Sequence, residues 1–419
     1  MGTIVSACGG DAESPYGREA LVQARSAHEL GDSLGVNVHL SNIDTSYADF
    51  GTLQSRLREL GVTHIRDGIC PTCQYQMDRL KWLGASGVKA DIVIGSLEGG
   101  TTEMQTNLAA IRDRLPGVVE SVEAPNEPDA GPDPHWMESA RAYQSELFTR
   151  VKGDPALAAL PVLGPALVHR HSRAALGDIS AYLDRGNLHP YPGGAPPLSN
   201  LEDERRLAAK VSKNKPLWIT EVGYHSDNTR QDHLPASERA IQLYTPRIAL
   251  ETFNAGIERA YIYQLADPFT DAEARARNFP LMENRFGLLR ADMSRKPSYL
   301  ALRNLLRAVQ ANSAPVRSPG GLRLALRGAG FDVRRLLLRA ADGSFSLVLW
   351  RGASVWDVHA RRDQLPRPDH LEVVFDQPVA LARRFDPVSS DSASERWKNP
   401  KRISVALEAE PVVLRLTLP

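Results

Sequence analysis

The chain has 419 residues, of which 42% are apolar and 24% are charged. This is the profile of a soluble globular protein with a sizeable core, and the length suits one large domain plus one small domain. Lys+Arg and Asp+Glu both number 50, so the formal net charge is zero. A balanced charge gives no reason to expect nucleic acid or an anionic membrane surface as a partner. No apolar run reaches the length of a transmembrane helix, so we expect no transmembrane segment.

Residues 1–30 are polar and lack a convincing hydrophobic period, so we interpret them as a tail or as a strand-bearing lead-in to another domain. Within them, Val5-Ser6-Ala7-Cys8-Gly9 resembles the end of a bacterial lipoprotein signal. The basic and apolar regions that precede such a cysteine are missing, and an accidental likeness is the alternative. We expect a secreted or cell-envelope protein. The sequence gives no prediction of the oligomeric state.

From Leu34 onward, short apolar or β-branched runs alternate with longer amphipathic segments. This alternation is typical of a parallel sheet covered by helices. The eight predicted strands are 34–38, 62–66, 90–94, 118–122, 162–164, 187–188, 217–220 and 260–263. The predicted helices are 47–60, 74–86, 102–115, 136–151, 171–184, 201–212, 237–254 and 297–309.

Eight strand–helix units in residues 31–312 predict an α/β fold of the (β/α)8 TIM-barrel type, whose usual size is about 250 residues. A doubly wound open sheet is the alternative. Such a sheet would normally carry a glycine-rich phosphate turn after its first strand. The first predicted strand is instead followed by His39-Leu40-Ser41, which favours the barrel.

The pattern changes after residue 312. Two segments, 311–315 and 318–321, have the composition of a linker, and strand-length runs without long helical periods follow them. The predicted strands are 336–339, 345–350, 371–375, 380–385, 403–407 and 412–418. Residues 313–419 are therefore predicted to form a small antiparallel β-sandwich accessory domain, whose role the sequence leaves open.

Cys70 and Cys73 have the spacing of a redox or metal-binding pair, but no second Cys/His pair follows at zinc-site spacing. A short loop disulfide and two free thiols are the remaining interpretations. His169 and His171 form a His-x-His pair, yet further ligands on other strands are missing. We expect no metal and no cofactor.

Polar residues cluster where the predicted barrel strands end, which is where barrel enzymes carry their chemistry. Glu127 and Glu221 follow strands on opposite sides of the barrel mouth, so both side chains can face one cleft. A facing carboxylate pair is the equipment for glycosidic bond cleavage, with one group protonated and the other ionised. Arg66 would stabilise the ionised form of Glu221, and Tyr191 or Tyr224 would donate a hydrogen bond to it.

Two motifs make a resemblance specific: Asn126-Glu127-Pro128 after the fourth strand and Trp218-Ile219-Thr220-Glu221 at the seventh. Together with the segment 285–299 they resemble clan A of the glycoside hydrolases, the 4/7 barrels that mostly cleave β-linked bonds with retention. The trailing sandwich resembles the family 39 arrangement. The resemblance implies that Glu127 is the acid/base and Glu221 the nucleophile.

The resemblance also implies that Asn126 contacts the sugar 2-hydroxyl, that Arg66 braces the nucleophile, and that His189 and Tyr191 line the same subsite. The clan often has a tryptophan at its eighth strand, where this chain has Tyr261-Ile262-Tyr263-Gln264-Leu265. The further candidate substrate-binding residues are His39, Tyr224, Trp136 and Gln264.

Several of these residues also have a structural interpretation. His39 at a strand end can be a hydrogen-bonded core residue, and Trp136 can open a helix that packs on the barrel. Asp129 and Asp133 are interpreted as loop and turn residues. The predicted function is retaining hydrolysis of β-linked oligo- or polysaccharides. The alternatives are a catalytically inactive carbohydrate-binding barrel and a metal-dependent barrel hydrolase.

Overall fold

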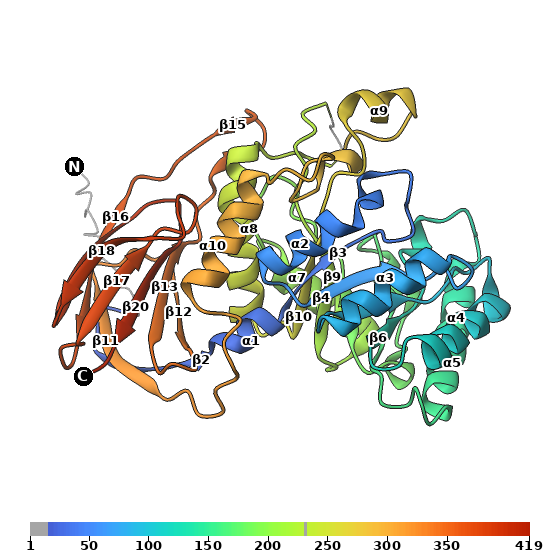
Figure 1. Cartoon of the computed structure of the whole chain (residues 1–419), viewed down its shortest axis with the longest axis horizontal. Coiled ribbons are helices and arrows are strands. Elements are labelled where there is room, and N and C mark those ends of the chain that lie inside the picture. The colour runs from blue at the N-terminus through green and yellow to red at the C-terminus, as the bar shows by residue number, and fades with distance from the viewer. Residues whose placement is uncertain (1–15, 230–232) are drawn as a thin grey trace, which may run out of the picture.

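The computed structural model describes residues 16–229 and 233–419. The candidate lipoprotein cysteine, Cys8, lies outside the described residues. Figure 1 shows an α/β region beside a layer of antiparallel strands, with helices α8 (Glu238–Asn254) and α10 (Pro297–Ala308) between them. Among the described residues, no helix has the length and apolar character that crossing a membrane requires.

The α/β region is a nearly closed parallel barrel of eight strands, in the order β7-β6-β5-β4-β3-β10-β9-β8. A bridge from Leu163 to Arg185 brings β7 beside β8, and the Gly164 amide donates to the Arg185 carbonyl at 3.0 Å. The eight predicted strands and the barrel fold are confirmed. The strands are β3 (Leu34–Asn37), β4 (His64–Gly68), β5 (Lys89–Val93), β6 (Val119–Glu123), β7 (Val162–Leu163), β8 (Gly186–Leu188), β9 (Leu217–Val222) and β10 (Arg259–Ile262).

Helices cover the outside of this barrel, and local signals set several of their ends. Gly61 ends α2 with φ 84°, a left-handed conformation that suits glycine, and the Ser237 side chain accepts from the Ala240 amide at the start of α8. The remaining α-helices of the described barrel are α1 (Ala27–Asp32), α2 (Phe50–Leu60), α3 (Gln74–Ala85), α4 (Gly100–Arg114), α5 (Trp136–Gly153), α6 (Ser172–Leu176), α7 (Leu201–Ser212) and α9 (Asp271–Ala276).

The predicted helix over 171–184 is only partly correct. It divides into α6 and the 3-10 turn η3 (Ser180–Tyr182), because Gly177 at φ 67° leaves the helical conformation. The short helix α9 was not predicted. It starts with a capping box in which Thr270 and Glu273 satisfy each other's backbone amides.

The antiparallel strands form two sheets, β1-β11-β16-β19 and β18-β17-β20-β13-β12-β2. Apolar side chains from both sheets meet in one core, which is the arrangement expected of a sandwich. The strands are β1 (Ala20–Gln23), β2 (Arg25–Ser26), β11 (Gly321–Arg327), β12 (Val333–Arg339), β13 (Phe345–Arg351), β16 (Asp369–Phe375), β17 (Leu381–Phe385), β18 (Ala393–Lys398), β19 (Arg402–Leu407) and β20 (Val412–Thr417). A separate hairpin joins β14 (Trp356–Asp357) to β15 (Arg362–Asp363).

Strands β1 and β2, in the segment interpreted as a tail or a strand-bearing lead-in to another domain, pair with β11 and β12 of the sandwich. Two other features of the sandwich were not predicted. Strand β11 begins at Gly321, inside the segment predicted as linker. Strand β18 is an exposed edge strand whose residues are mostly polar, so it lacks the alternating apolar pattern by which a strand is recognised.

The sandwich is attached to the barrel through buried polar contacts of α8. The Arg247 side chain has no exposed surface, and its guanidinium donates to the Ala353 carbonyl at 2.8 Å and to Glu251 at 3.0 Å. The Tyr244 hydroxyl accepts from the Val355 amide at 3.0 Å. Removing either member of such a buried ion pair is costly, because the remaining charge is left buried without its partner.

We therefore expect Arg247→Ala to lower the free energy of unfolding by about 3–5 kcal/mol, because it leaves the mostly buried Glu251 carboxylate without its cation. Urea denaturation measures this loss. The matched control is Arg206→Ala, which removes an i,i+3 pair with Asp203 whose arginine side chain is 75% exposed. The control should change the free energy of unfolding by less than about 1 kcal/mol. Equal losses in the two variants would contradict the assignment.

Candidate active site

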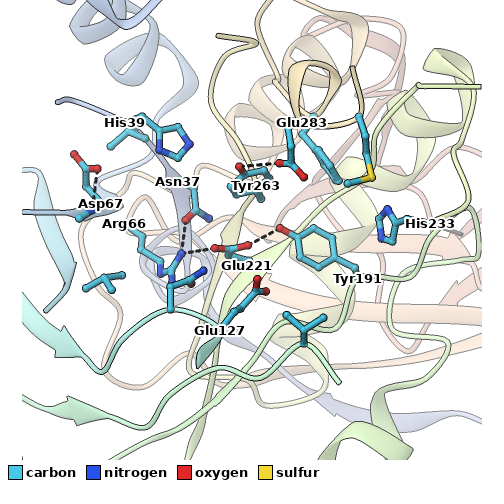
Figure 2. Close-up of a pocket in the computed structure, with 17 residues that line it drawn as sticks. Asn37, His39, Arg66, Asp67, Glu127, Tyr191, Glu221, His233, Tyr263 and Glu283 are labelled. Carbon is cyan, nitrogen blue, oxygen red and sulfur yellow. Dashed lines mark hydrogen bonds and ion pairs between the residues drawn. The ribbon is translucent and has the colours of Figure 1, made fainter. Parts of the chain in front are cut away.

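A cleft of about 670 Å³ opens at the carboxyl ends of the barrel strands (Figure 2). Its position is the usual site of chemistry in a (β/α)8 barrel. The cleft is lined by Asn37, Val38, His39, Arg66, Asp67, Gly68, Val93, Asn126, Glu127, Val168, Tyr191, Glu221, His233, Tyr263, Met282, Glu283 and Phe286. Six of the ten predicted site residues are among them.

Glu127 stands on the loop after β6 in a left-handed backbone conformation, φ 44° and ψ 54°. This conformation is uncommon for a residue with a side chain and costs on the order of 1–3 kcal/mol. Pro128 follows at the first position of the 3-10 turn η2 (Pro128–Ala130), and the Ala130 amide donates to the Glu127 carbonyl at 3.0 Å. The turn thus fixes the direction of one carboxylate.

Glu221 lies within β9 and is 7% exposed. Arg66 Nη1 donates to its Oε1 at 2.5 Å, and the Tyr191 hydroxyl donates to its Oε2 at 2.6 Å. Of the two predicted tyrosine partners, the structure therefore selects Tyr191. The Tyr224 hydroxyl donates instead to the Ala195 carbonyl at 2.9 Å, and its ring stacks on Tyr244 away from the cleft.

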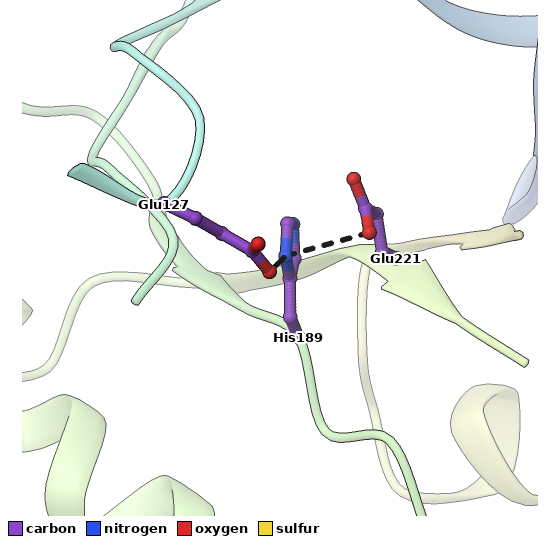
Figure 3. Close-up of side chains that lie close together, drawn as sticks. All are labelled: Glu127, His189 and Glu221. Atoms are coloured by element: carbon purple, nitrogen blue, oxygen red, sulfur yellow. Dashed lines mark hydrogen bonds and ion pairs between the residues drawn. The ribbon is translucent and has the colours of Figure 1, made fainter. Parts of the chain in front are cut away.

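His189 stands between the two carboxylates (Figure 3). Its Nδ1 is 2.7 Å from Glu127 Oε1 and 3.6 Å from Glu221 Oε2, while its Nε2 is 3.0 Å from Thr220 Oγ1. One donor atom from each of Glu127, His189 and Glu221 lies within 4.8 Å of the others. The two carboxylates therefore share one small space at the bottom of the cleft.

Arg66 uses all five of its N–H groups, and Figure 2 shows the contacts to Asn37 and Glu221. Nε and Nη2 donate to the two oxygens of Glu123 at 2.9 and 2.8 Å. The remaining hydrogens go to Asn126 Oδ1 at 2.6 Å, Asn37 Oδ1 at 3.0 Å and Glu221. Because Asn126 accepts from Arg66 through its oxygen, its amide nitrogen is left to face the cleft.

Burial raises the pKa of the Glu221 carboxyl, but His189, Arg66 and the Tyr191 hydroxyl together outweigh it and hold the pKa below its ordinary value. Burial next to the Glu221 charge raises the pKa of Tyr191 well above its ordinary value, so the phenol stays protonated and donates. Burial lowers the pKa of His39. The site thus keeps Glu221 ionised.

Aromatic rings form one wall of the cleft. Tyr263 and Phe286 approach at 5.3 Å between ring centroids, and Tyr191 lies 5.6 Å from Phe286 and 6.2 Å from Tyr263. His233 adds a fourth ring, 5.6 Å from Tyr191. Tyr263 follows β10, where the clan often has tryptophan, so a phenol ring lines this end of the cleft. Glu283 lies beside it and accepts from the Tyr263 hydroxyl at 3.2 Å.

Four predicted residues are not among those that line the cleft. One is His189, described above between the two carboxylates, and the other three lie elsewhere. Trp136 opens α5 and packs against the apolar cluster of Leu167 and Leu176. Gln264 is buried beyond the end of β10, where its amide binds the Tyr47 hydroxyl and the Glu283 carbonyl. Tyr224, described above, is the third. In each case the side chain turns to a packing partner that is distant in sequence.

Several residues that support the site were missed by the sequence analysis. The most informative is Glu123, which is fully buried and accepts two parallel hydrogen bonds from Arg66. Its signal was an acidic residue at the end of an apolar strand, four positions before Glu127. Asp129 was interpreted as a turn residue, but its carboxylate accepts from the Val168 and His169 amides at 3.0 and 2.9 Å. It thereby ties the loop after β7 to the loop after β6.

The Glu127, His189 and Glu221 cluster is the one group of described residues whose spacing suits a metal ion. The chemistry of the donors argues against that use. Arg66 and Tyr191 already donate to the two oxygens of Glu221, and a cation here would stand beside the Arg66 guanidinium. Elsewhere in the barrel, Cys70 and Cys73 are joined by a disulfide, so they are neither free thiols nor metal ligands.

Solved structures of glycoside hydrolases, among them family 39 enzymes, superpose on this barrel and sandwich. A family 39 glycoside hydrolase from Bacteroides cellulosilyticus WH2 superposes with a TM-score of 0.63 at 16% identity, over 94% of this chain and 81% of that one. A monomeric β-xylosidase from Caulobacter crescentus CB15 superposes with a TM-score of 0.63 at 14% identity, over 95% of this chain and 98% of that one.

A family 17 β-1,3-glucanosyltransferase from Rhizomucor miehei gives a TM-score of 0.50 at 17% identity, over 63% of this chain and 95% of that one. The sequence matches no family model and no curated protein. At these identities the likeness shows the glycosidase fold, and the activity of this chain must be argued from its own residues.

Arg66→Met should lower the free energy of unfolding at pH 7 by about 3–5 kcal/mol, because it leaves Glu123 and Glu221 buried without their cation. In the variant, burial would raise the pKa of the Glu221 carboxyl above its unfolded value, because the Arg66 charge no longer lowers it. The stabilising contribution of this group is then present at low pH and lost as pH rises. Urea unfolding at pH 4 and pH 7 checks this, and an equal loss at both pH values would contradict it.

Proposed function

We propose that this protein is a retaining β-glycosidase in which Glu221 is the nucleophile and Glu127 the acid/base. The observation that carries the proposal is the proximity of the two groups, because one carboxylate oxygen of Glu127 and one of Glu221 lie within 4.8 Å of each other. Retaining enzymes hold their carboxyl groups about 5–5.5 Å apart, and inverting enzymes about 6.5–9.5 Å apart to admit a water. The short separation supports retention.

The surroundings of each carboxylate support the division of roles. Glu221 is held ionised by Arg66 and Tyr191, so its oxygen can attack the anomeric carbon. In that step the C1–O bond to the leaving group breaks, the bond from Glu221 to C1 forms, and Glu127 gives its proton to the departing oxygen. Glu127 then takes a proton from water, whose oxygen bonds to C1 and releases Glu221.

His189 supports the acid role of Glu127. The single hydrogen of the Thr220 hydroxyl points to an acceptor, Asn187 Oδ1 at 2.8 Å or Glu123 Oε1 at 3.3 Å. The Thr220 oxygen therefore accepts from His189 Nε2–H, and Nδ1 faces Glu127 across 2.7 Å. One proton is held between Nδ1 and the Glu127 carboxyl, where it is ready for transfer to the leaving oxygen.

The cleft also favours an uncharged sugar. Its lining contains the carboxylates of Glu127, Glu221 and Glu283, and the charge of Arg66 is shared between Glu221 and Glu123. A uronic acid would therefore meet like charge. The wall formed by Tyr191, Tyr263 and Phe286 presents aromatic surface on which the apolar face of a pyranose can pack. The Cys70–Cys73 disulfide suits an exported protein that meets polysaccharide outside the cytosol.

Replacing either carboxylate should abolish turnover of aryl β-glycosides of neutral sugars. Glu221→Gln should lower kcat/KM by about four orders of magnitude or more, and Glu127→Gln by about 10²- to 10⁴-fold. NMR of the wild-type reaction should show the β-anomer as the first product. Azide should restore activity to Glu127→Ala, and the product of that reaction should be a β-glycosyl azide. An α-anomer as first product would contradict retention, and a wild-type protein without turnover would leave only carbohydrate binding.

Tyr191→Phe should move the acidic limb of kcat/KM upward by up to about one pH unit, because the lost hydrogen bond no longer lowers the pKa of Glu221. Activity needs ionised Glu221, so it is lost as pH falls through the pKa of that group. The matched control is Tyr224→Phe, which removes a buried hydroxyl that does not contact Glu221. If both variants move the limb equally, the assigned role of Tyr191 is wrong.

A further inference from the structure

Beneath the nucleophile lies a second carboxylate that shares its cation. Glu123, the last residue of β6, has no exposed surface and receives two parallel hydrogen bonds from Arg66 at 2.8 and 2.9 Å. Such a fork fixes the plane of a guanidinium more firmly than a single contact does. The same plane aims Arg66 Nη1 at Glu221. The position of Glu123 therefore determines how Arg66 meets the nucleophile.

A third acid, Asp91, sets the charge balance of this group. Asp91 on β5 is fully buried and lies in register with Arg66 on one side and Ser121 on the other. Its Oδ1 accepts from the Ser121 hydroxyl at 2.6 Å. Its Oδ2 has no hydrogen-bond partner among the described residues. Burial and the neighbouring Glu123 charge raise its pKa well above the ordinary value. The raised pKa favours the neutral form of Asp91, and Arg66 is the cation that contacts both Glu123 and Glu221.

We propose that Glu123 is a positioning residue that shares Arg66 with the nucleophile and so sets how strongly Arg66 stabilises the ionised form of Glu221. The inference rests on the proposed function. In the free enzyme, Arg66 is divided between two carboxylates, so Glu221 keeps part of its nucleophilic charge. When Glu221 is esterified in the glycosyl-enzyme, Arg66 and Glu123 remain as a neutral buried pair.

The consequence for catalysis differs between the two steps. Without the Glu123 charge, the Arg66 charge would interact mainly with Glu221. Glu221 would then become a weaker nucleophile and a better leaving group. Glycosylation should slow, and hydrolysis of the glycosyl-enzyme should not. A merely structural role of Glu123 would lower both steps together.

The charged and titratable groups that face Glu221 come from several elements. They are Arg66 on β4, His39 after β3, Glu127 after β6, His189 and Tyr191 after β8, and Tyr263 after β10. Glu123 itself faces Arg66, Asp91 and the Thr220 hydroxyl. A substitution at Glu123 leaves the groups that face Glu221 in place, so a moved pH limb reports on the charge around Arg66, to which Glu123 and its neighbour Asp91 contribute.

The test is Glu123→Gln, which keeps the shape of the side chain and removes its charge. With a 2,4-dinitrophenyl β-glycoside, we expect kcat/KM to fall about tenfold and the pre-steady-state burst of dinitrophenol to shrink. The acidic limb of kcat/KM should move down by about one pH unit. Glu123→Asp, which keeps the charge but draws it back from Arg66, should give an intermediate shift and serves where the glutamine variant does not fold.

The matched control is Glu120→Gln. Glu120 belongs to the same strand and pairs with His64 and Arg259 at the amino end of the barrel, away from Arg66. Its replacement should lower thermal stability without moving the limb or the burst. An unmoved limb in a folded, active Glu123 variant overturns the inference, as does an equal shift in Glu120→Gln. Neither result touches the proposed function, whereas a wild-type protein without turnover would overturn both.

Discussion

The arrangement of the cleft depends on one buried cation. Burying a guanidinium is costly unless its charge and all its N–H groups find partners. Arg66 on β4 meets this condition by contacting three other barrel strands or their ends: Asn37 from β3, Glu123 and Asn126 from β6 and the loop after it, and Glu221 from β9. The requirement to satisfy Arg66 therefore positions Glu221 and the Asn126 side chain together.

Two carboxylates within 4.8 Å of each other would repel if both were ionised in the same surroundings. The chain separates their surroundings instead. Glu221 lies on a regular strand and is bound by Arg66 and Tyr191, both of which favour its charged form. Glu127 lies on a left-handed turn, and its Oε1 is 2.7 Å from His189 Nδ1. That turn directs the Glu127 carboxyl into the space that Glu221 also faces.

The hydrophobic period of the sequence and the positions of the strand ends made the barrel predictable. Buried parallel strands are apolar runs in the sequence, and their carboxyl ends meet at one mouth of the barrel. Arg66, Glu127 and Glu221 could be found for this reason. The choice between Tyr191 and Tyr224 could not, since both follow barrel strands and only packing decides which hydroxyl reaches Glu221. The place of Trp136 was settled in the same way, by an apolar cluster drawn from other helices. Likewise, β1 joins a sheet whose other strands begin some 300 residues later.

The sandwich reaches the cleft through the same kind of long-range packing. Tyr224 ties the loop after β8 to α8 by donating to the Ala195 carbonyl and stacking on Tyr244 at 5.1 Å. Tyr244 in turn binds the Val355 amide of the sandwich. Gly194, in the same loop, lies so close to Trp356 and Val358 that a Cβ would meet their side chains at 2.7 and 2.5 Å. That loop also carries Tyr191, whose hydroxyl binds Glu221, so the sandwich supports the wall of the cleft through this loop.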